Sequence, residues 1–286
     1  MIPKNKIILG TANFGKNYGL FKNKVDKNEI MSILNYAKKN KIKYLDTAEE
    51  YSKLDLKYNK NFRKFKIFKK LNLNSNFLKD SSKINLNKNL SKVIFNDYPC
   101  FSLTLRKPDI LLKTSGKKVF KILSEFRKLG KIKKIGISIY DTKNLKKIIN
   151  NFKIDYIQLP LNIINYEVFN LTKKIIRNKK IEIHVRSIFL QGLLLKKSNQ
   201  LPLQLKKLKP NWKKLEKKIS NLKLTHYEAC LNFIINSKVD KIIIGINDKK
   251  HLKKFLNFKK INSIIPFFYI KRKKLIDPIY WLKFIK

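Results

Sequence analysis

The stretch Tyr44-Leu-Asp-Thr-Ala-Glu-Glu-Tyr51 ends a short apolar run in an aspartate and places a tyrosine five residues later. The next apolar run, Phe65-Lys-Ile-Phe-Lys-Lys70-Leu, reaches a lysine in the same way. An ammonium close to a phenol lowers the pKa of the phenol, and a neighbouring carboxylate holds the ammonium in place. Asp46, Tyr51 and Lys70 at the ends of consecutive strands would therefore form a proton donor for use near neutral pH. The alternative is structural, with Asp46 capping a helix and Tyr51 in the core.

Outward from this stretch, short apolar runs of strand type alternate with helical patterns along the chain. Eight runs are expected to be strands: Lys6–Gly10, Lys43–Asp46, Phe65–Phe68, Phe101–Leu105, Lys134–Ser138, Ile154–Gln158, Ile181–Arg186 and Lys241–Gly245. The helices between them are expected to begin at Asp26 with Glu29, at Asp141 or Thr142, at Thr225 with Glu228 and at Asp248, and one is expected to end at Gly130.

Eight strand–helix units joined by short turns, without a Gly/Ser-rich linker, predict an α/β fold, a single (β/α)8 TIM barrel over residues 1–286. The alternative is a doubly wound open sheet, but Gly10-Thr-Ala-Asn-Phe-Gly15 does not match its GxGxxG pattern. Residues 52–98 are rich in Lys and Asn and show poor periodicity. Residues 187–222 form a long segment after the seventh predicted strand, and in a barrel such a segment lies on the active-site face.

The charge of the chain is unusual, because 67 Lys+Arg against 19 Asp+Glu give a formal net charge of +48. A field of this sign attracts nucleic acid or anionic membranes. Only six of the basic residues are arginines, however, and specific recognition of phosphates and bases relies on arginine. We attribute the lysines to a codon bias towards Lys, Asn, Ile and Phe. No specific nucleic-acid partner is expected. Weak, salt-sensitive adhesion to polyanions is expected all the same.

The remaining composition predicts a cytoplasmic protein without a metal site. Cys100 and Cys230 are far apart and are expected to be core residues in a reducing compartment. The three histidines form no cluster with metal-ligand spacing. The sequence shows no signal-peptide pattern and no long uncharged apolar segment, so no membrane association is expected. A monomer is expected because no apolar helix or strand edge is left unassigned.

Six stretches of the sequence resemble the aldo-keto reductase superfamily, in the order that the family has them. They are Leu9–Gly15, Asp46–Tyr51, Lys131–Ser138, Asp155–Pro160 with Asn162, Arg186–Gly192 and Ile243–Asn247. Each lies at the C-terminal end of a predicted strand. The sequence of Arg186–Gly192 resembles that of bacterial family members whose genes are often found with surface-polysaccharide genes.

The resemblance implies NAD(P)H-dependent reduction of an aldehyde or ketone without a metal, with a sugar-type carbonyl as one class of small-molecule substrate. Tyr51 would protonate the carbonyl oxygen, and Asp46 and Lys70 would support it. Lys70, rather than Lys69, fills the family's lysine position. NADPH is the expected cofactor ahead of NADH.

The resemblance also implies a set of cofactor-binding residues. Ser138 and Gln158 match the positions that hold the nicotinamide carboxamide, and Arg186 matches the position of the flat side chain that stacks on the nicotinamide. The other positions carried over are Gly10, Thr11, Ser187, Gly245 and Asn247. The amides of the helix that follows Asn247 would suit a cofactor phosphate, and Lys249 and Lys250 would lie near a 2′-phosphate.

The sequence departs from the family pattern at several positions. Arg106 stands where the family has its fourth catalytic residue, a histidine, and an arginine there would either donate hydrogen bonds to a carbonyl oxygen or fill the substrate site. Lys41 and Ser52 replace usual glycines, and His251 and Phe255 replace polar groups near the adenosine. These departures leave an alternative open, a catalytically weak or inactive barrel that binds a nucleotide or a partner protein.

Overall fold

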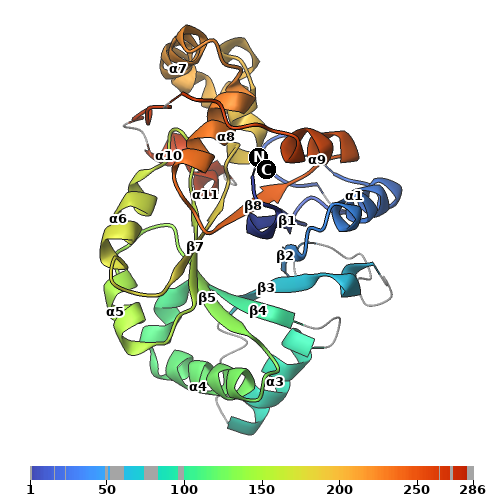
Figure 1. Cartoon of the computed structure of the whole chain (residues 1–286). Coiled ribbons are helices and arrows are strands. Elements are labelled where there is room, and N and C mark those ends of the chain that lie inside the picture. The colour runs from blue at the N-terminus through green and yellow to red at the C-terminus, as the bar shows by residue number, and fades with distance from the viewer. Residues whose placement is uncertain are drawn as a thin grey trace.

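Eight parallel strands close into a barrel in chain order in the computed structural model of this chain (Figure 1). The structure describes residues 2–15, 17–22, 24–48, 51, 61–73, 83–95, 100–263, 265–270 and 273–281. The strands are β1 (Ile7–Gly10), β2 (Tyr44–Ala48), β3 (Lys66–Asn72), β4 (Cys100–Arg106), β5 (Lys134–Ser138), β6 (Tyr156–Pro160), β7 (Glu182–Arg186) and β8 (Lys241–Gly245). The predicted (β/α)8 barrel is confirmed. Glu49, Glu50 and Ser52, and much of 52–98, lie outside the described residues.

Six of the eight predicted strands have different bounds in the structure, and β3 and β6 differ most. β3 continues to Asn72, because its second half pairs residue by residue with β4 and because Lys69 and Lys70 are buried there. β6 begins at Tyr156, although the amide of Asp155 just before it still donates a backbone hydrogen bond to the carbonyl of Ile135 at 2.8 Å. The carboxylate of Asp155 also accepts hydrogen bonds from the amide of Ile135 at 2.7 Å and from Nη1 of Arg127 at 2.9 Å.

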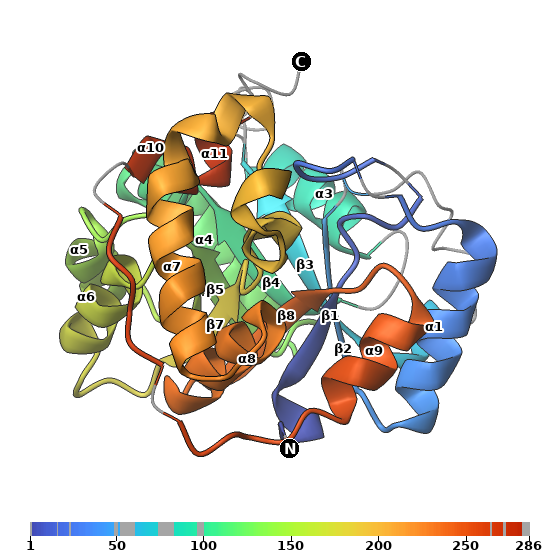
Figure 2. The same ribbon diagram turned by 90° about the horizontal axis from the view of Figure 1, so that it is seen from above.

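Helices surround the barrel on its outer side (Figures 1 and 2). They are α1 (Lys27–Lys39), α3 (Lys83–Phe95), α4 (Thr114–Lys128), α5 (Leu145–Asn151), α6 (Glu167–Ile175), α7 (Lys209–Asn221), α8 (His226–Asn236), α9 (Lys249–Leu256), α10 (Lys273–Ile276) and α11 (Pro278–Trp281). Short 3-10 turns at Lys4–Lys6, Phe62–Lys64, Pro108–Leu112, Leu190–Leu195, Ser198–Gln200 and Leu203–Leu208 complete the described elements. Helices α7, α10 and α11 were not predicted. No described helix is long and apolar enough to cross a membrane.

Most predicted helix ends are confirmed. The side chains of Asp26, Thr225 and Asp248 accept hydrogen bonds from backbone amides at the starts of α1, α8 and α9. Gly130 follows α4 with a φ of 70°. The cap predicted for α5 is wrong, because this helix starts after Asn144, and Asp141 accepts instead from the amide of Lys143.

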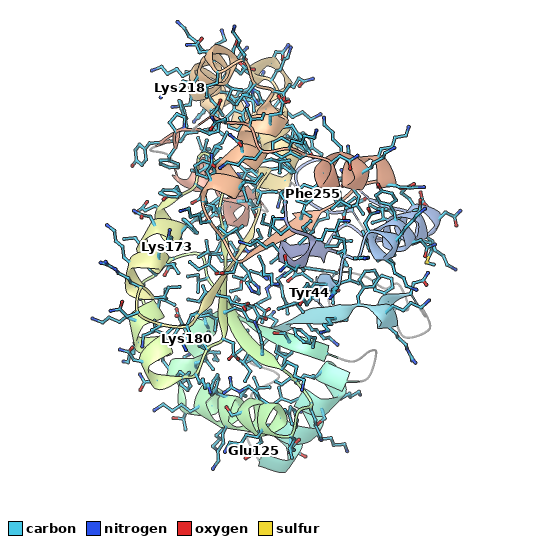
Figure 3. All side chains as sticks on the ribbon, in the orientation of Figure 1. Tyr44, Glu125, Lys173, Lys180, Lys218 and Phe255 are labelled. Atoms are coloured by element: carbon cyan, nitrogen blue, oxygen red, sulfur yellow. The ribbon has the colours of Figure 1, made fainter. Side chains whose placement is uncertain are left out.

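The lysines of the described helices lie on the outer faces of these helices, as their spacing indicates, whereas Lys69 and Lys70 of β3 are buried. Lys173, Lys180 and Lys218 are exposed and point outward in Figure 3. Phe255 of α9 is fully buried, and Cys100 and Cys230 are buried free thiols. The main core fills the space between strands and helices, where the burial of apolar side chains is the chief stabilising contribution.

A layer of rings crosses the inside of the barrel. The ring of Tyr156 stacks on His184 with centroids 4.3 Å apart, and Phe68 lies 5.5 Å from each of them, edge to face. Ile8 and Ile243 pack in the same layer. The layer therefore fills the barrel axis with close-packed side chains.

Polar groups bound this aromatic layer on both sides. The Tyr156 hydroxyl hydrogen-bonds with Ser102 at 3.0 Å and with Thr104 at 2.6 Å. At the N-terminal ends of the strands, Nε2 of His184 lies 2.9 Å from Oε2 of Glu182, and Lys134 pairs with the other oxygen of Glu182. The barrel interior thus separates this lower ion-pair cluster from the polar groups at the C-terminal ends of the strands.

Candidate active site

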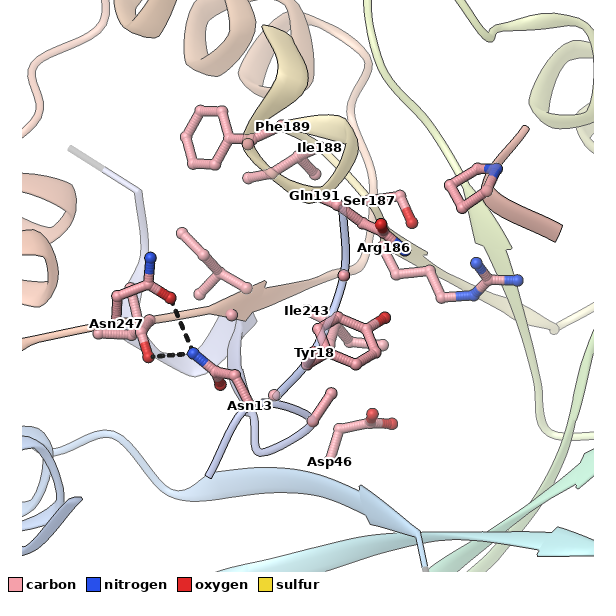
Figure 4. Close-up of a pocket in the computed structure, with 18 of the residues that line it drawn as sticks. Asn13, Tyr18, Asp46, Arg186, Ser187, Ile188, Phe189, Gln191, Ile243 and Asn247 are labelled. Carbon is pink, nitrogen blue, oxygen red and sulfur yellow. Dashed lines mark hydrogen bonds between the residues drawn. The ribbon is translucent and has the colours of Figure 1, made fainter. Parts of the chain in front are cut away.

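A cavity of about 1030 Å³ opens at the C-terminal ends of the strands (Figure 4). Its described lining includes Gly10, Arg106, Ser138, Arg186 and Gly245, each of which is the last residue of its strand. The segment after β7 contributes six further residues, Ser187, Ile188, Phe189, Gln191, Gly192 and Leu195. The expectation that residues 187–222 approach the active-site face is therefore confirmed for its first part.

An ion pair is buried at the floor of this cavity. Nζ of Lys70 on β3 donates a hydrogen bond to Oδ1 of Asp46 on β2, because adjacent parallel strands bring the two positions together. Nε2 of Gln158 donates to the second oxygen, Oδ2, at 2.9 Å. The structure brings Lys70, rather than Lys69, to the aspartate.

Tyr51 lies next to this pair, with Nζ of Lys70 5.3 Å from the centre of its ring. Burial acts to lower the pKa of Lys70, but the Asp46 carboxylate and the Tyr51 hydroxyl outweigh it, and the net pKa is raised. Lys70 therefore stays an ammonium beside the phenol.

A second tyrosine, Tyr18, enters the cavity from the segment after β1. Its ring centroid lies 6.4 Å from that of Tyr51. Burial, followed by the neighbouring Tyr51, raises the pKa of Tyr18, so its hydroxyl stays protonated. The sequence reasoning missed this residue, because the segment carries no periodic pattern that would single it out.

Two arginines end strands at this cavity. Arg106 ends β4, in register with Asn72 of β3 and Ser138 of β5. Arg186 ends β7, and its guanidinium carbon lies 4.3 Å from the ring centre of Tyr140. Within the described part of the chain, Nη2 of Arg186 is buried and has no hydrogen-bond partner.

Two asparagines join the segments after β1 and β8. Nδ2 of Asn13 donates to the carbonyl of Ile246 at 3.1 Å and to Oδ1 of Asn247 at 2.8 Å (Figure 4). Oδ1 of Asn13 is buried and has no partner among the described residues. Asn13 belongs to the motif that includes Gly10, but sequence reasoning did not single it out. The only signal was a polar residue three positions after the end of a buried strand.

Ten of the twelve predicted site residues line the cavity: Gly10, Asp46, Tyr51, Lys70, Arg106, Ser138, Arg186, Ser187, Gly245 and Asn247. The other two, Thr11 and Gln158, are buried behind the lining, where both contact Asp46. The Thr11 hydroxyl donates to the Asp46 carbonyl at 3.3 Å. Asn162 donates to the carbonyl of Ser187 at 3.0 Å, supporting its left-handed backbone with φ of 59°.

The N-terminus of α9 differs from the predicted phosphate site. The carboxylate of Glu29 accepts from the amide of Lys249 at 2.6 Å, and that of Asp248 accepts from the amide of His251 at 2.7 Å. Two carboxylates thus already occupy donors of this helix end. Neither Lys249 nor Lys250 is part of the described lining.

The face of α9 that lines the cavity carries His251, Lys254 and Phe255. Nζ of Lys254 lies 4.4 Å from the ring centre of Tyr227, which stacks on Phe189 at 5.3 Å. This end of the cavity therefore combines aromatic rings with a positive charge.

The sequence profile described as "Aldo/keto reductase family" matches residues 6–263, most of the chain. The chain belongs to the aldo-keto reductase family. It is accordingly an oxidoreductase that acts on carbonyl compounds, and members of this family use nicotinamide cofactors. No curated protein matches the sequence.

Several solved structures share the fold of this aldo-keto reductase. The holo form of the aldo-keto reductase AKR11C1 from Bacillus halodurans has a TM-score of 0.67 at 16% identity, over 90% of this chain and 88% of that one. The thermostable aldo-keto reductase Tm1743, complexed with the inhibitor epalrestat, has a TM-score of 0.63 at 20% identity, over 91% of this chain and 92% of that one. The glycerol dehydrogenase AKR11B4 from Gluconobacter oxydans has a TM-score of 0.63 at 16% identity, over 98% of this chain and 93% of that one.

Proposed function

We propose that this aldo-keto reductase reduces an aldehyde or ketone, a sugar-type carbonyl among them, with Tyr51 as proton donor and NADPH as hydride source. The observation that carries the proposal is the buried pair of Asp46 and Lys70, with the Lys70 ammonium beside the Tyr51 ring at the floor of the cavity. A phenol next to a fixed ammonium is suited to giving up a proton, because the ammonium stabilises the phenolate that remains.

Each residue has a defined part in the proposed reaction. The Tyr51 hydroxyl transfers its proton to the carbonyl oxygen, and Lys70 stabilises the resulting phenolate while Asp46 holds Lys70. Arg106 donates hydrogen bonds to the oxygen as negative charge develops on it. The reduced nicotinamide, when bound, supplies a hydride to the carbonyl carbon. The products are an alcohol and the oxidised cofactor, and Tyr51 recovers its proton from solvent.

The residues around the cavity support nicotinamide binding. Ser138 and Gln158 are neighbours in the register of β5 and β6, and Oε1 of Gln158 is a buried acceptor without a partner among the described residues. Such an oxygen suits the amide group of a nicotinamide. A side chain added at Gly245 would meet nothing within 4 Å, so the end of β8 leaves room for a flat group.

The preference for NADPH rests on the positive end of the cavity. Lys254 and His251 both line it, from the face of α9. An ammonium there would attract the 2′-phosphate that distinguishes NADPH from NADH. The Phe189 and Tyr227 rings beside it offer a surface on which the adenine can stack.

The test of the proposal is a fluorescence titration with NADPH at about 150 mM salt, where surface electrostatics are screened, with ATP as a polyanion control. Saturable NADPH binding well ahead of ATP is expected, followed by turnover of a panel of carbonyl substrates. Tyr51→Phe should lower kcat roughly 100- to 10,000-fold because the general acid is lost, and should leave NADPH binding intact. Unchanged turnover in this variant would exclude Tyr51 as the donor.

The alternative function is a barrel that binds a nucleotide or partner protein with little redox turnover. The observation that favours it is Arg106, which lines the cavity at the position of the family histidine. Equal affinity for NADPH and ATP in the same titration would support this alternative, because the net charge of +48 would then explain the binding.

A further inference from the structure

The cavity carries a large excess of positive charge. Its described lining contains five cationic side chains, Lys22, Lys70, Arg106, Arg186 and Lys254. The same lining contains one carboxylate, Asp46, which is already neutralised by Lys70. In the described lining, the cations therefore outnumber the carboxylates by five to one.

Arg186 lies at a different end of the cavity from Asn13 and Asn247. In Figure 4 its side chain points away from Asn13 and Asn247, which join the ends of β1 and β8. The Tyr140 ring, 4.3 Å from the guanidinium carbon, covers one face of the group and holds its orientation. This packing favours a fixed hydrogen-bonding fork over a stacking platform for the nicotinamide.

One arm of this fork lacks a partner. Nη2 of Arg186 is buried and makes no hydrogen bond within the described residues. A buried charged donor that stays unpaired is costly, and a ligand that pairs with it binds more tightly for that reason. The planar guanidinium matches the two oxygens of a carboxylate or phosphate group.

Arg186 is also close to the proton donor. Burial is the main cause of the raised pKa of Tyr18, and the charge of Arg186 acts on the same hydroxyl in the opposite direction. Tyr18 in turn contacts Tyr51. A group bound by Arg186 would therefore share the cavity with a carbonyl held at Tyr51.

We propose that Arg186 binds an anionic group of the substrate, so that the preferred substrates are carbonyl compounds carrying a carboxylate or a phosphate. This inference rests on the proposed reductase function. The phosphates of the cofactor are not the expected ligand of Arg186. We proposed that the cofactor phosphate lies at Lys254, and the pair Asn13 and Asn247 lies at the end of the cavity away from Arg186.

The experiment compares matched substrates at about 150 mM salt. The carboxylate pair is 4-carboxybenzaldehyde and benzaldehyde, and the phosphate pair is glyceraldehyde 3-phosphate and glyceraldehyde. The unmodified enzyme should show a kcat/KM at least 10-fold higher for the anionic member of one pair, and the pair in which this occurs tells carboxylate from phosphate. The same kcat/KM for both members of both pairs overturns the proposal, whether or not any variant folds.

Arg186→Gln tests the residue itself. It should lower kcat/KM for the preferred anionic substrate roughly 10- to 100-fold, the loss expected for a charge-assisted hydrogen bond, and should lower kcat/KM for the neutral partner by a clearly smaller factor. The matched control is Arg177→Gln, which removes the same charge at an exposed position after α6 and should change neither. Equal loss on both members of a pair overturns the proposal, because Arg186 would then serve the cofactor or the chemistry.

A binding measurement separates this proposal from the reductase function. Calorimetry with 4-(hydroxymethyl)benzoate and with benzyl alcohol needs no turnover. One outcome is that the protein binds the benzoate, that Arg186→Gln abolishes this binding, and that the protein reduces no aldehyde. This outcome would support the anion site and contradict the proposed function. Reduction of aldehydes without any anion preference would support the reductase and contradict the anion site.

Discussion

Nζ of Lys70 donates a hydrogen bond to Oδ1 of Asp46, and the two side chains are only 6% and 2% exposed. Two charges taken out of water in this way are tolerable only as a pair, because each compensates the desolvation of the other. Gln158 satisfies the second carboxylate oxygen. The pair therefore links the stability of the barrel to the position of its proposed catalytic ammonium.

Asp46→Ala is expected to lower the free energy of unfolding by about 3–5 kcal/mol, because it leaves the Lys70 ammonium buried and unpaired. The double variant Asp46→Ala/Lys70→Met should recover much of this loss, since it removes the orphaned charge. Urea unfolding of the two single variants and the double variant measures both effects. A single-variant loss below about 1 kcal/mol would mean that water reaches the pair.

Arg106→Ala is expected to lower kcat roughly 100-fold or more, because a donor to the developing oxyanion is removed. Arg106→His keeps a donor at this position and should retain more of the activity than Arg106→Ala. Steady-state kinetics with one aldehyde and a fixed NADPH concentration make the comparison. Higher turnover in Arg106→His than in the unmodified enzyme would show instead that the arginine obstructs the substrate site.

Acid should destabilise the protein through Glu182 and His184. The hydrogen bond from His184, followed by that from Lys134 and opposed by burial, lowers the pKa of Glu182 from 4.5 to about 2. Its stabilisation is complete above pH 4.5 and is lost as the pH falls towards 2. Burial lowers the pKa of His184 below 6.5, so the unfolded chain takes up a proton there that the folded chain does not. Stability therefore starts to fall below about pH 6.5.

Glu182→Gln tests the acidic part of this pH dependence. The difference in urea midpoint between the unmodified protein and Glu182→Gln should shrink as the pH falls from 4.5 to 2. The reason is that protonation makes Glu182 of the unmodified protein as neutral as the glutamine of the variant. Glu167→Gln, which removes an exposed carboxylate in α6, is the matched control. A difference that stays constant over this range would show that Glu182 does not carry the effect.

Gly136→Ala should destabilise the barrel by about 1–3 kcal/mol or more. An added Cβ would lie 2.3 Å from ring atoms of Tyr156, and this ring cannot move away because Ser102 and Thr104 hold its hydroxyl. Gly245→Ala is the control, since its Cβ would meet nothing within 4 Å. Equal urea midpoints for the two variants would contradict the predicted clash.

The strands and main helices were accessible from the sequence because their burial leaves a periodic pattern. The eight apolar runs predicted the eight strands, and Asp26, Thr225 and Asp248 marked helix starts. The pattern failed at β3, where buried lysines interrupt the apolar run. It also failed at α7, which lies in a segment expected only to face the active site.

Residues of the candidate site were predictable where they lie in the strands that border the cavity, as Asp46, Lys70 and Arg186 do. Tyr18, Tyr140 and Asn13 were missed, because their contacts join loops that are distant in sequence. The same holds for the carboxylate of Glu29, which was assigned to its own helix and binds the N-terminus of α9 instead. Local patterns do not encode such long-range partners.

The aromatic layer across the barrel has a consequence for how the proposed proton donor is recharged. Phe68, Tyr156 and His184 close the barrel axis between the lower ion-pair cluster and Lys70. A chain of water molecules cannot run through this layer. In the proposed reaction, the proton that returns to Tyr51 after each turnover would therefore come not along the barrel axis but from the side of the cavity, the side from which substrate would arrive and product would leave.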